Sequence, residues 1–304
     1  MKSFWLLLVC FALPLSSPGQ TKNEHPKITG IDHVVIYVSD LKAARDFYAT
    51  KLGLNENGGG CDDARILNCF TVNWITGQRV ILKTSTSCPR TDCLDEVVFQ
   101  TADARKLRSF LSAHGVAVDQ LQKSDNISLS FETQDADGHR VGFTQKVGFP
   151  INDPGPGIKV SYGRIIHAGF VVHDRSAEDH FFKDILGFRV YWHGGRTDDE
   201  TSWVDMQVPD GTDWIEYMLN VPADADRHTL GVMNHIALGV PDIHAAEAQL
   251  RKNGWSGNEK PKIGRDGKWQ LNLYDPDDTR VEFMEFTPVQ KPCCSDYTGP
   301  HPKP

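Results

Sequence analysis

The segment "IIHAGFVV" (residues 165–172) places a histidine third in an otherwise apolar run that is typical of a buried β-strand. The same design occurs in "IDHVVIYV" (31–38) and in "MNHIALGV" (233–240). A strand design that recurs along a chain indicates an internal repeat, so we take these segments as the opening strands of repeated units. The histidines that share this position are His33, His167 and His235.

A stretch with helical spacing follows these strands. The segments "SDLKAARDFYATKLGL" (39–54) and "PDIHAAEAQLRKNGW" (241–255) predict helices, because their apolar residues recur every three or four positions. A glycine, which accepts the left-handed backbone that often ends a helix, stands 19 or 20 residues after each histidine. The predicted buried residues are Leu41, Ala44, Tyr48, Leu52, Ile243, Ala246 and Leu250, and the glycines are Gly53, Gly187 and Gly254.

A fourth unit begins at "LDEVVFQT" (94–101), where Glu96 takes the histidine position 19 residues before Gly115. Short β-like runs follow each helical stretch, so each unit is predicted to be strand–helix–strand–strand–strand. One such unit cannot bury its helix and its sheet face alone, and we therefore expect the four units to pair into two domains.

The predicted domains span residues 28–148 and 160–288. The segment between them, 148–163, is rich in proline and glycine, which indicates a linker. The tail 289–304 is rich in proline and is predicted to be irregular. The fold class that follows is α+β, with four βαβββ modules paired into two domains.

The charge of the chain argues against a polyanionic partner. It has 304 residues and a formal net charge of −8, and its Lys and Arg residues form no basic run. Binding to nucleic acid or to an anionic membrane surface is therefore not expected.

The first residues differ in character from the rest. Lys2 precedes an apolar stretch (4–15) that is shorter than the roughly 20 residues needed to span a bilayer. This layout is typical of a secretory signal peptide, and small residues place its cleavage after Gly19, so that residues 1–19 are removed. We expect a secreted or periplasmic protein with no membrane association beyond this peptide. An uncleaved anchor, or a lipid at Cys10, is the alternative.

Six cysteines would remain after cleavage, and an even number in an exported chain indicates disulfides. Six cysteines allow about 15 pairings, and none of the spacings resembles that of a zinc finger, so the sequence leaves the pairing open. The six are Cys61, Cys69, Cys88, Cys93, Cys293 and Cys294.

Paired βαβββ units with a histidine in the opening strand resemble the vicinal oxygen chelate superfamily. This group includes glyoxalase I, the extradiol ring-cleaving dioxygenases, methylmalonyl-CoA epimerase, and the bleomycin and fosfomycin resistance proteins. The resemblance covers about residues 28–288. It implies a metal inside the paired modules, held by histidines from opening strands and carboxylates from closing strands.

The closing strands of the four units differ. Glu282 in "DPDDTRVEFMEF" follows His235 by 47 residues, and Glu216 in "PDGTDWIEYML" follows His167 by 49. The second unit has Gly142 at this place, and the first offers only Ile81 or Leu82. The resemblance therefore implies a metal site in the C-terminal domain only, with His33 as a remnant of the repeat or a satisfied core histidine. The alternative is that the two glutamates face solvent. The predicted ligands are His167, Glu216, His235 and Glu282.

A shell of two imidazoles and two carboxylates suits Zn, Ni, Fe or Mn. It resembles the shell of glyoxalase I more than those of the other members. The implied reaction is proton transfer next to a carbonyl on a small molecule that presents two adjacent oxygens, with Glu216 or Glu282 as the base. The predicted export argues against the usual intracellular substrate of glyoxalase I. An oligomer is possible, and the sequence does not name the substrate.

Two alternatives remain. Extradiol dioxygenases share the four-module length and would use His167, His235 and Glu282 with Fe(II). However, Asn272 stands where such enzymes place a tyrosine and Asp205 near where they place a histidine, although His193 and Tyr274 could substitute. The third possibility is a binding protein without catalysis.

Overall fold

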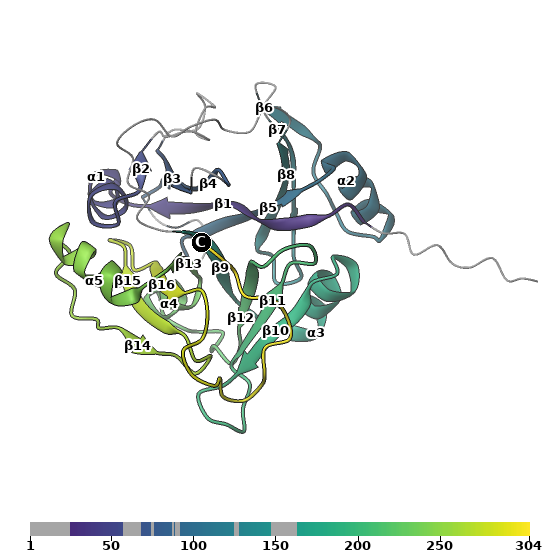
Figure 1. Cartoon of the computed structure of the whole chain (residues 1–304). Helices are drawn as coiled ribbons and strands as arrows, with labels where there is room; N and C mark the ends of the chain where they lie inside the picture. Colours follow the sequence, from purple (N-terminus) through teal and green to yellow (C-terminus); the bar gives the residue numbers. More distant parts are fainter. Residues whose placement is uncertain are drawn as a thin grey trace, which may run out of the picture.

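The computed structural model describes residues 25–56, 68–73, 76–86, 88, 92–124, 128–146 and 163–304. The predicted signal peptide (1–19), Cys61 and most of the predicted linker lie outside these residues. In Figure 1 the N-terminal half lies above the C-terminal half, and helices flank the sheet of each half.

Each half contains one eight-stranded sheet, and the two sheets have the same topology. The first has the order β2-β3-β4-β1-β5-β8-β7-β6, and the second has the order β10-β11-β12-β9-β13-β16-β15-β14. The prediction of four βαβββ modules in an α+β fold is confirmed. The strands of the first sheet are Ile28–Val38 (β1), Asn55–Glu56 (β2), Cys69–Asn73 (β3), Gln78–Thr84 (β4), Leu94–Thr101 (β5), Gln122–Ser124 (β6), Ser128–Gln134 (β7) and Arg140–Lys146 (β8).

The opening strand of every module pairs in parallel with the closing strand of the same module and antiparallel with the opening strand of the other module in its half. This arrangement brings two opening and two closing strands together in the middle of each sheet. The strands of the second sheet are Arg164–Val171 (β9), Arg189–Gly194 (β10), Trp203–Gln207 (β11), Trp214–Met218 (β12), His235–Val240 (β13), Lys262–Ile263 (β14), Trp269–Tyr274 (β15) and Arg280–Glu285 (β16).

The helices occupy their predicted places, but two of them change type. The helix predicted over 39–54 begins as an α-helix and continues as a π-helix, in which Leu52 N–H donates to Phe47 C=O. The third module repeats this change, while Ala44, Tyr48 and Leu52 are fully buried as predicted. One helix, α4, was not predicted. The helices are Leu41–Arg45 (α1), Asp46–Lys51 (η1), Ala104–Ala113 (α2), Arg175–Glu178 (α3), Asp179–Ile185 (η2), Arg227–Met233 (α4) and Ile243–Lys252 (α5).

One apolar core cluster extends through both sheets, and side chains also tie the two halves together. The Gln78 amide donates to the carbonyls of Ile31 (2.9 Å) and Ile165 (3.0 Å) and accepts from Ile165 N–H. Asp213, which holds the equivalent place in the third module, accepts from Ile31 N–H at 2.9 Å. The opening strands β1 and β9 are thereby held next to each other.

The tail 289–304 contains neither helix nor strand and lies along the edge of the second sheet. Its backbone and side chains bind β10: Cys293 C=O accepts from Trp192, and Thr298 N–H donates to Tyr191 C=O. None of the helices within the described residues is long and apolar enough to cross a membrane. Two disulfides lie wholly within the described residues, Cys88–Cys93 and Cys293–Cys294.

Candidate metal centre

The four predicted ligands lie on four adjacent strands, β12, β9, β13 and β16. His167 on β9 and His235 on β13 come from the two opening strands, and Glu216 and Glu282 come from the closing strands on either side. The His235 ring lies over Gly169, where an added Cβ would be 2.1 Å from the ring. The glycine in "IIHAGFVV" therefore makes room for the second histidine.

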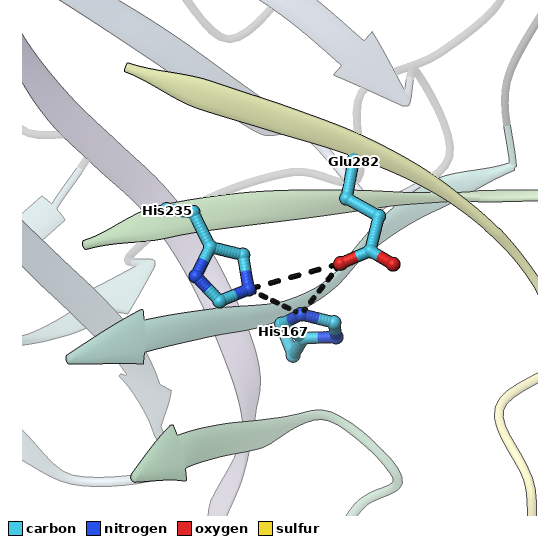
Figure 2. Close-up of side chains that lie close together, drawn as sticks. All are labelled: His167, His235 and Glu282. Atoms are coloured by element: carbon cyan, nitrogen blue, oxygen red, sulfur yellow. Dashed lines mark hydrogen bonds and ion pairs between the residues drawn. The ribbon is translucent and has the colours of Figure 1, made fainter. Parts of the chain in front are cut away.

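The reactive atoms of these side chains converge. The Nε2 atoms of His167 and His235 are 3.1 Å apart, and Glu216 Oε2 lies 3.6 Å and 3.1 Å from them, respectively. Glu282 Oε2 lies 3.8 Å from both Nε2 atoms, so three of the side chains form a tight triangle (Figure 2). The structure thus brings all four predicted ligands together.

This geometry fits a divalent metal. Two ligand atoms bound at about 2.1 Å and at right angles lie roughly 3 Å apart, close to the separations here. His235 Nδ1–H donates to Met233 C=O at 2.9 Å, which turns Nε2 toward the other ligands. The His167 ring rests on Trp214, with centroids 4.8 Å apart. The side chains are therefore oriented as metal ligands before any ion binds.

Burial controls the charge of the four groups. Removal from water raises the pKa of Glu216 and of Glu282 to about 7, and it holds the pKa of both histidines well below the usual range. The imidazoles are therefore neutral and can donate their Nε2 lone pairs, while the two carboxyls are costly to ionise together. A divalent cation would relieve this cost.

Two cations, which sequence reasoning missed, border the centre: Arg280 is half-buried and Lys268 is buried. Arg280 Nη2 donates to His235 Nε2 at 2.6 Å, on the side where a metal would bind. Lys268 is fully buried, and its ammonium lies 4.5 Å from the centroid of the Trp214 ring. A signal for Arg280 existed, because three of the four closing strands contain Arg–Val, at residues 79–80, 140–141 and 280–281. No sequence signal identifies Lys268.

A cavity of about 280 Å³ opens onto the centre. Its lining combines tryptophan rings with carboxylates, amides and basic side chains. The cavity can therefore hold a small molecule beside the ligands and shield it from bulk water. Its lining includes Trp192, Trp203, Trp214, Asp205, Asn272 and Met284.

The equivalent positions of the N-terminal half carry a different set of groups. His33 Nδ1 lies 2.8 Å from Asp32 Oδ2, and the same carboxylate binds Arg79. At Gly142 an added Cβ would be 2.5 Å from Glu96 Oε1, so no closing-strand side chain fits beside Glu96 without a shift. His33 therefore belongs to an ion-pair network and has no closing-strand carboxylate opposite it.

The sequence profile of the glyoxalase/bleomycin resistance protein/dioxygenase superfamily matches residues 30–58 and 164–283. The chain therefore carries the sequence profile of this superfamily over these two ranges. The matched ranges contain His33 and all four residues of the metal centre. No curated protein sequence matches the chain.

Solved structures of extradiol dioxygenases share the fold of this chain. A homoprotocatechuate 2,3-dioxygenase variant from B. fuscum has a TM-score of 0.64 at 17% identity, with 93% of this chain and 75% of that chain covered. The native enzyme from Arthrobacter globiformis has a TM-score of 0.64 at 17% identity, with 86% and 80% covered. The Brevibacterium fuscum enzyme in complex with 3,4-dihydroxyphenylacetate has a TM-score of 0.62 at 17% identity, with 88% and 83% covered.

The positions that separate the predicted activities also lie in the cavity. Asp205 pairs with Glu216 across β11 and β12, Asn272 pairs with Glu282 across β15 and β16, and both face the cavity. His193 and Tyr274 are not among the cavity-lining residues in the described part of the chain. The suggested substitutes for a catalytic histidine and tyrosine therefore do not reach this site.

Proposed function

We propose that this protein is a metal-dependent enzyme that moves a proton on a small molecule held through two adjacent oxygens. The metal ligands would be His167, His235 and Glu282, with Glu216 as a fourth. The observation that carries the proposal is the second carboxylate: Glu216 Oε2 lies 3.1 Å from His235 Nε2 and lines the cavity. Ring-cleaving enzymes of this superfamily use one carboxylate, and proton transfer benefits from a second.

The residues of the centre have separable roles in this reaction. A divalent ion bound by the four ligands would polarise an oxygen of the substrate. Glu216 is the better candidate for the base, because its side chain remains 15% exposed toward the cavity, against 4% for Glu282. Without a bound ion, burial raises the pKa of Glu216 to about 7, so a Glu216 carboxylate released from the ion would accept and return a proton near neutral pH. The tryptophan rings that line the cavity exclude water from the reacting carbon.

The metal identity stays within Zn, Ni, Fe or Mn, as predicted for a mixed nitrogen and oxygen shell. The substrate is proposed to be a small organic molecule such as an α-hydroxy carbonyl compound.

Extradiol ring cleavage with Fe(II) is the second candidate, because the fold matches those dioxygenases over most of the chain. The triangle of His167, His235 and Glu282 would suffice to hold iron. Two residues that line the cavity argue against ring cleavage, since Asp205 and Asn272 occupy the places where a catalytic histidine and tyrosine are expected. A binding protein without catalysis is the third candidate.

The decisive experiment compares two reactions on the same preparations. Protein loaded separately with Zn, Ni, Mn or Fe(II) would be incubated in D₂O with α-hydroxy ketones or with hemithioacetals of 2-oxoaldehydes, and exchange at carbon followed by NMR. We expect exchange, with a loss of about 100-fold or more in Glu216→Gln while the metal is retained. Oxygen uptake on catechols by the Fe(II) protein, without exchange, would establish ring cleavage instead. Binding without turnover under every condition would establish the non-catalytic alternative.

We further propose that the protein is exported and cleaved after Gly19. The basis is the signal-peptide pattern of residues 1–19. N-terminal sequencing of material from the source organism should begin at Gln20. An intact Met1 would refute export through a cleaved peptide.

A further inference from the structure

A second group of potential ligands lies where the two halves of the protein meet. The turn between β7 and β8 (residues 135–139) contacts α3 of the C-terminal half. Asp135 and His139 from the turn, and Glu178 from α3, each offer one ligating atom within 4.8 Å of the others. All three residues are buried. This group is separate from the centre at His167 and His235.

The hydrogen bonds of this group fix its orientation but leave donor atoms free. Asp135 accepts from His139 N–H and lies against His139 Nδ1, both at 2.7 Å. The His139 ring stacks on Phe170, with centroids 4.5 Å apart. Glu178 Oε1 accepts from Asp137 N–H at 2.8 Å, whereas the buried Oε2 has no hydrogen-bond partner in the described part of the chain.

An independent observation is the hydroxyl of Tyr217 on β12. Tyr217 is fully buried, and among the described residues its hydroxyl has no hydrogen-bond partner. Burial raises its pKa, and the nearby charges of Asp179, Glu178 and Asp135 raise it further. The hydroxyl therefore lies within electrostatic reach of the same carboxylates. A buried tyrosine normally finds a partner for this group, so α3 and β12 each leave one unsatisfied polar atom here, Glu178 Oε2 and the Tyr217 hydroxyl.

The repeat provides a second interface for comparison. The turn 275–279 contacts the first module in the same way, with Asp275 in the place of Asp135. There Thr279 replaces the histidine, and Ala44 replaces the glutamate. Ala44 and Glu178 are equivalent because each follows the histidine of its opening strand, His33 or His167, by 11 residues.

The carboxylate at that second interface has a complete set of partners. Asp275 Oδ1 accepts from the backbone N–H groups of Asp277 and Thr279, both at 2.9 Å. Its Oδ2 accepts from the Tyr48 hydroxyl at 3.1 Å. The same turn and helix can therefore dock with the aspartate alone, without the histidine or the glutamate. The additional histidine and glutamate occur at one interface only, which argues for a role beyond docking.

We propose that Asp135, His139 and Glu178 bind a second divalent cation that links the two domains. One imidazole and two carboxylates form a donor set suited to Zn²⁺ or Mn²⁺, with Zn²⁺ the better match to a buried three-residue site. The Tyr217 hydroxyl would hydrogen-bond a carboxylate of this shell. Because the ligands come from both halves, the bound ion would stabilise the folded chain. This proposal does not depend on the activity of the first centre.

Metal stoichiometry tests the proposal directly. The double variant His139→Thr/Glu178→Ala copies the residues found naturally at the second interface, so it is expected to fold. After dialysis against Zn²⁺ and then against metal-free buffer, elemental analysis should find two ions in the wild type and one in this variant. The variant His167→Ala/His235→Ala, which lacks the first centre, should also retain one ion. Tyr48→Phe, which removes one hydrogen bond at the second interface, should retain two.

A stability measurement separates metal binding from a purely structural role. In His167→Ala/His235→Ala, saturating Zn²⁺ should raise the Tm by about 5 °C, as expected for a ligand well above its Kd. The shift should disappear when His139→Thr and Glu178→Ala are added, with an unchanged circular dichroism spectrum. An unchanged ion count in His139→Thr/Glu178→Ala would overturn the proposal. One ion in the wild type that is lost in His139→Thr/Glu178→Ala would leave the second site intact and refute only the first centre.

Discussion

The two halves of the protein use the same strand positions for opposite purposes. In the N-terminal half the opening strands present His33 and Glu96, and the closing strands present Ile81 and Gly142 two residues after an arginine. In the C-terminal half the closing strands present Glu216 and Glu282 at those same places. A histidine in the opening strand therefore does not by itself bring a set of potential metal ligands together. The closing strand decides which half can hold an ion.

The two halves also differ in how their buried or half-buried arginine and lysine side chains are paired. In the N-terminal half Arg79 is bound by Asp32, and Arg140 is bound by Asp95 and Glu132, so these positive charges have carboxylate partners. In the C-terminal half Arg280 donates to a histidine, and the Lys268 ammonium has no hydrogen-bond partner among the described residues. One half is a closed network of ion pairs, and the other holds its charges around a cavity.

The largest expected effect follows from removing one histidine in each half. His235→Ala should weaken divalent-metal binding by more than about 100-fold, because it removes a direct ligand. Even the loss of a residue that only hydrogen-bonds to a ligand lowers metal affinity by about 10- to 100-fold. His33→Ala should leave the affinity unchanged, since His33 binds Asp32 and Arg79. Titration with Zn²⁺ in competition with a chromophoric chelator measures both variants. Equal weakening in the two would show that the halves share one site.

The next effect concerns the N-terminal half and its stability. Burial, together with the charge of Glu132, raises the pKa of Glu96 from 4.5 to about 7. Because the folded pKa exceeds the unfolded one, the contribution of Glu96 to stability is complete below pH 4.5 and is lost as the pH rises through 7. The shift corresponds to about 3 kcal/mol. Denaturation of wild type and Glu96→Gln at pH 5 and pH 8 measures it.

Glu96→Gln should lose less stability between the two pH values than the wild type, by up to about 3 kcal/mol in the free energy of unfolding. Glu132→Gln serves as the control, since removal of that neighbouring charge should reduce the pH dependence without abolishing it. Identical pH profiles for Glu96→Gln and the wild type would mean that Glu96 ionises normally in the folded protein.

The sequence predicted the fold because its signals are local and repeated. The spacing from each opening-strand histidine to its glycine identified four modules, and counting to the closing strands identified Glu216 and Glu282. The change from α- to π-helix at Asp46 was missed, because one widened turn leaves the apolar spacing almost intact. Lys268 was missed because a single lysine carries no periodic signal of burial.

The group at the domain interface was out of reach for a different reason. Asp135 and His139 belong to a turn of one half, and Glu178 belongs to a helix of the other. Only the packing of the second module against the third brings them together. A comparison of the two turns, "DADGHRV" and "DPDDTRV", shows the histidine, but nothing in the sequence indicates that it meets Glu178.

The smallest expected effect concerns the arginine that each half places beside its histidine. Arg280→Met removes a positive charge 2.6 Å from His235 Nε2 and should strengthen metal binding by about tenfold, since the guanidinium and the ion compete for the same lone pair and repel each other. Arg79→Met removes the equivalent charge beside His33 and should leave metal affinity unchanged. The same chelator competition measures both. Weaker binding in Arg280→Met would mean that Arg280 supports the ligands and does not compete with the ion, which would make the C-terminal centre resemble the ion-pair network of the N-terminal half.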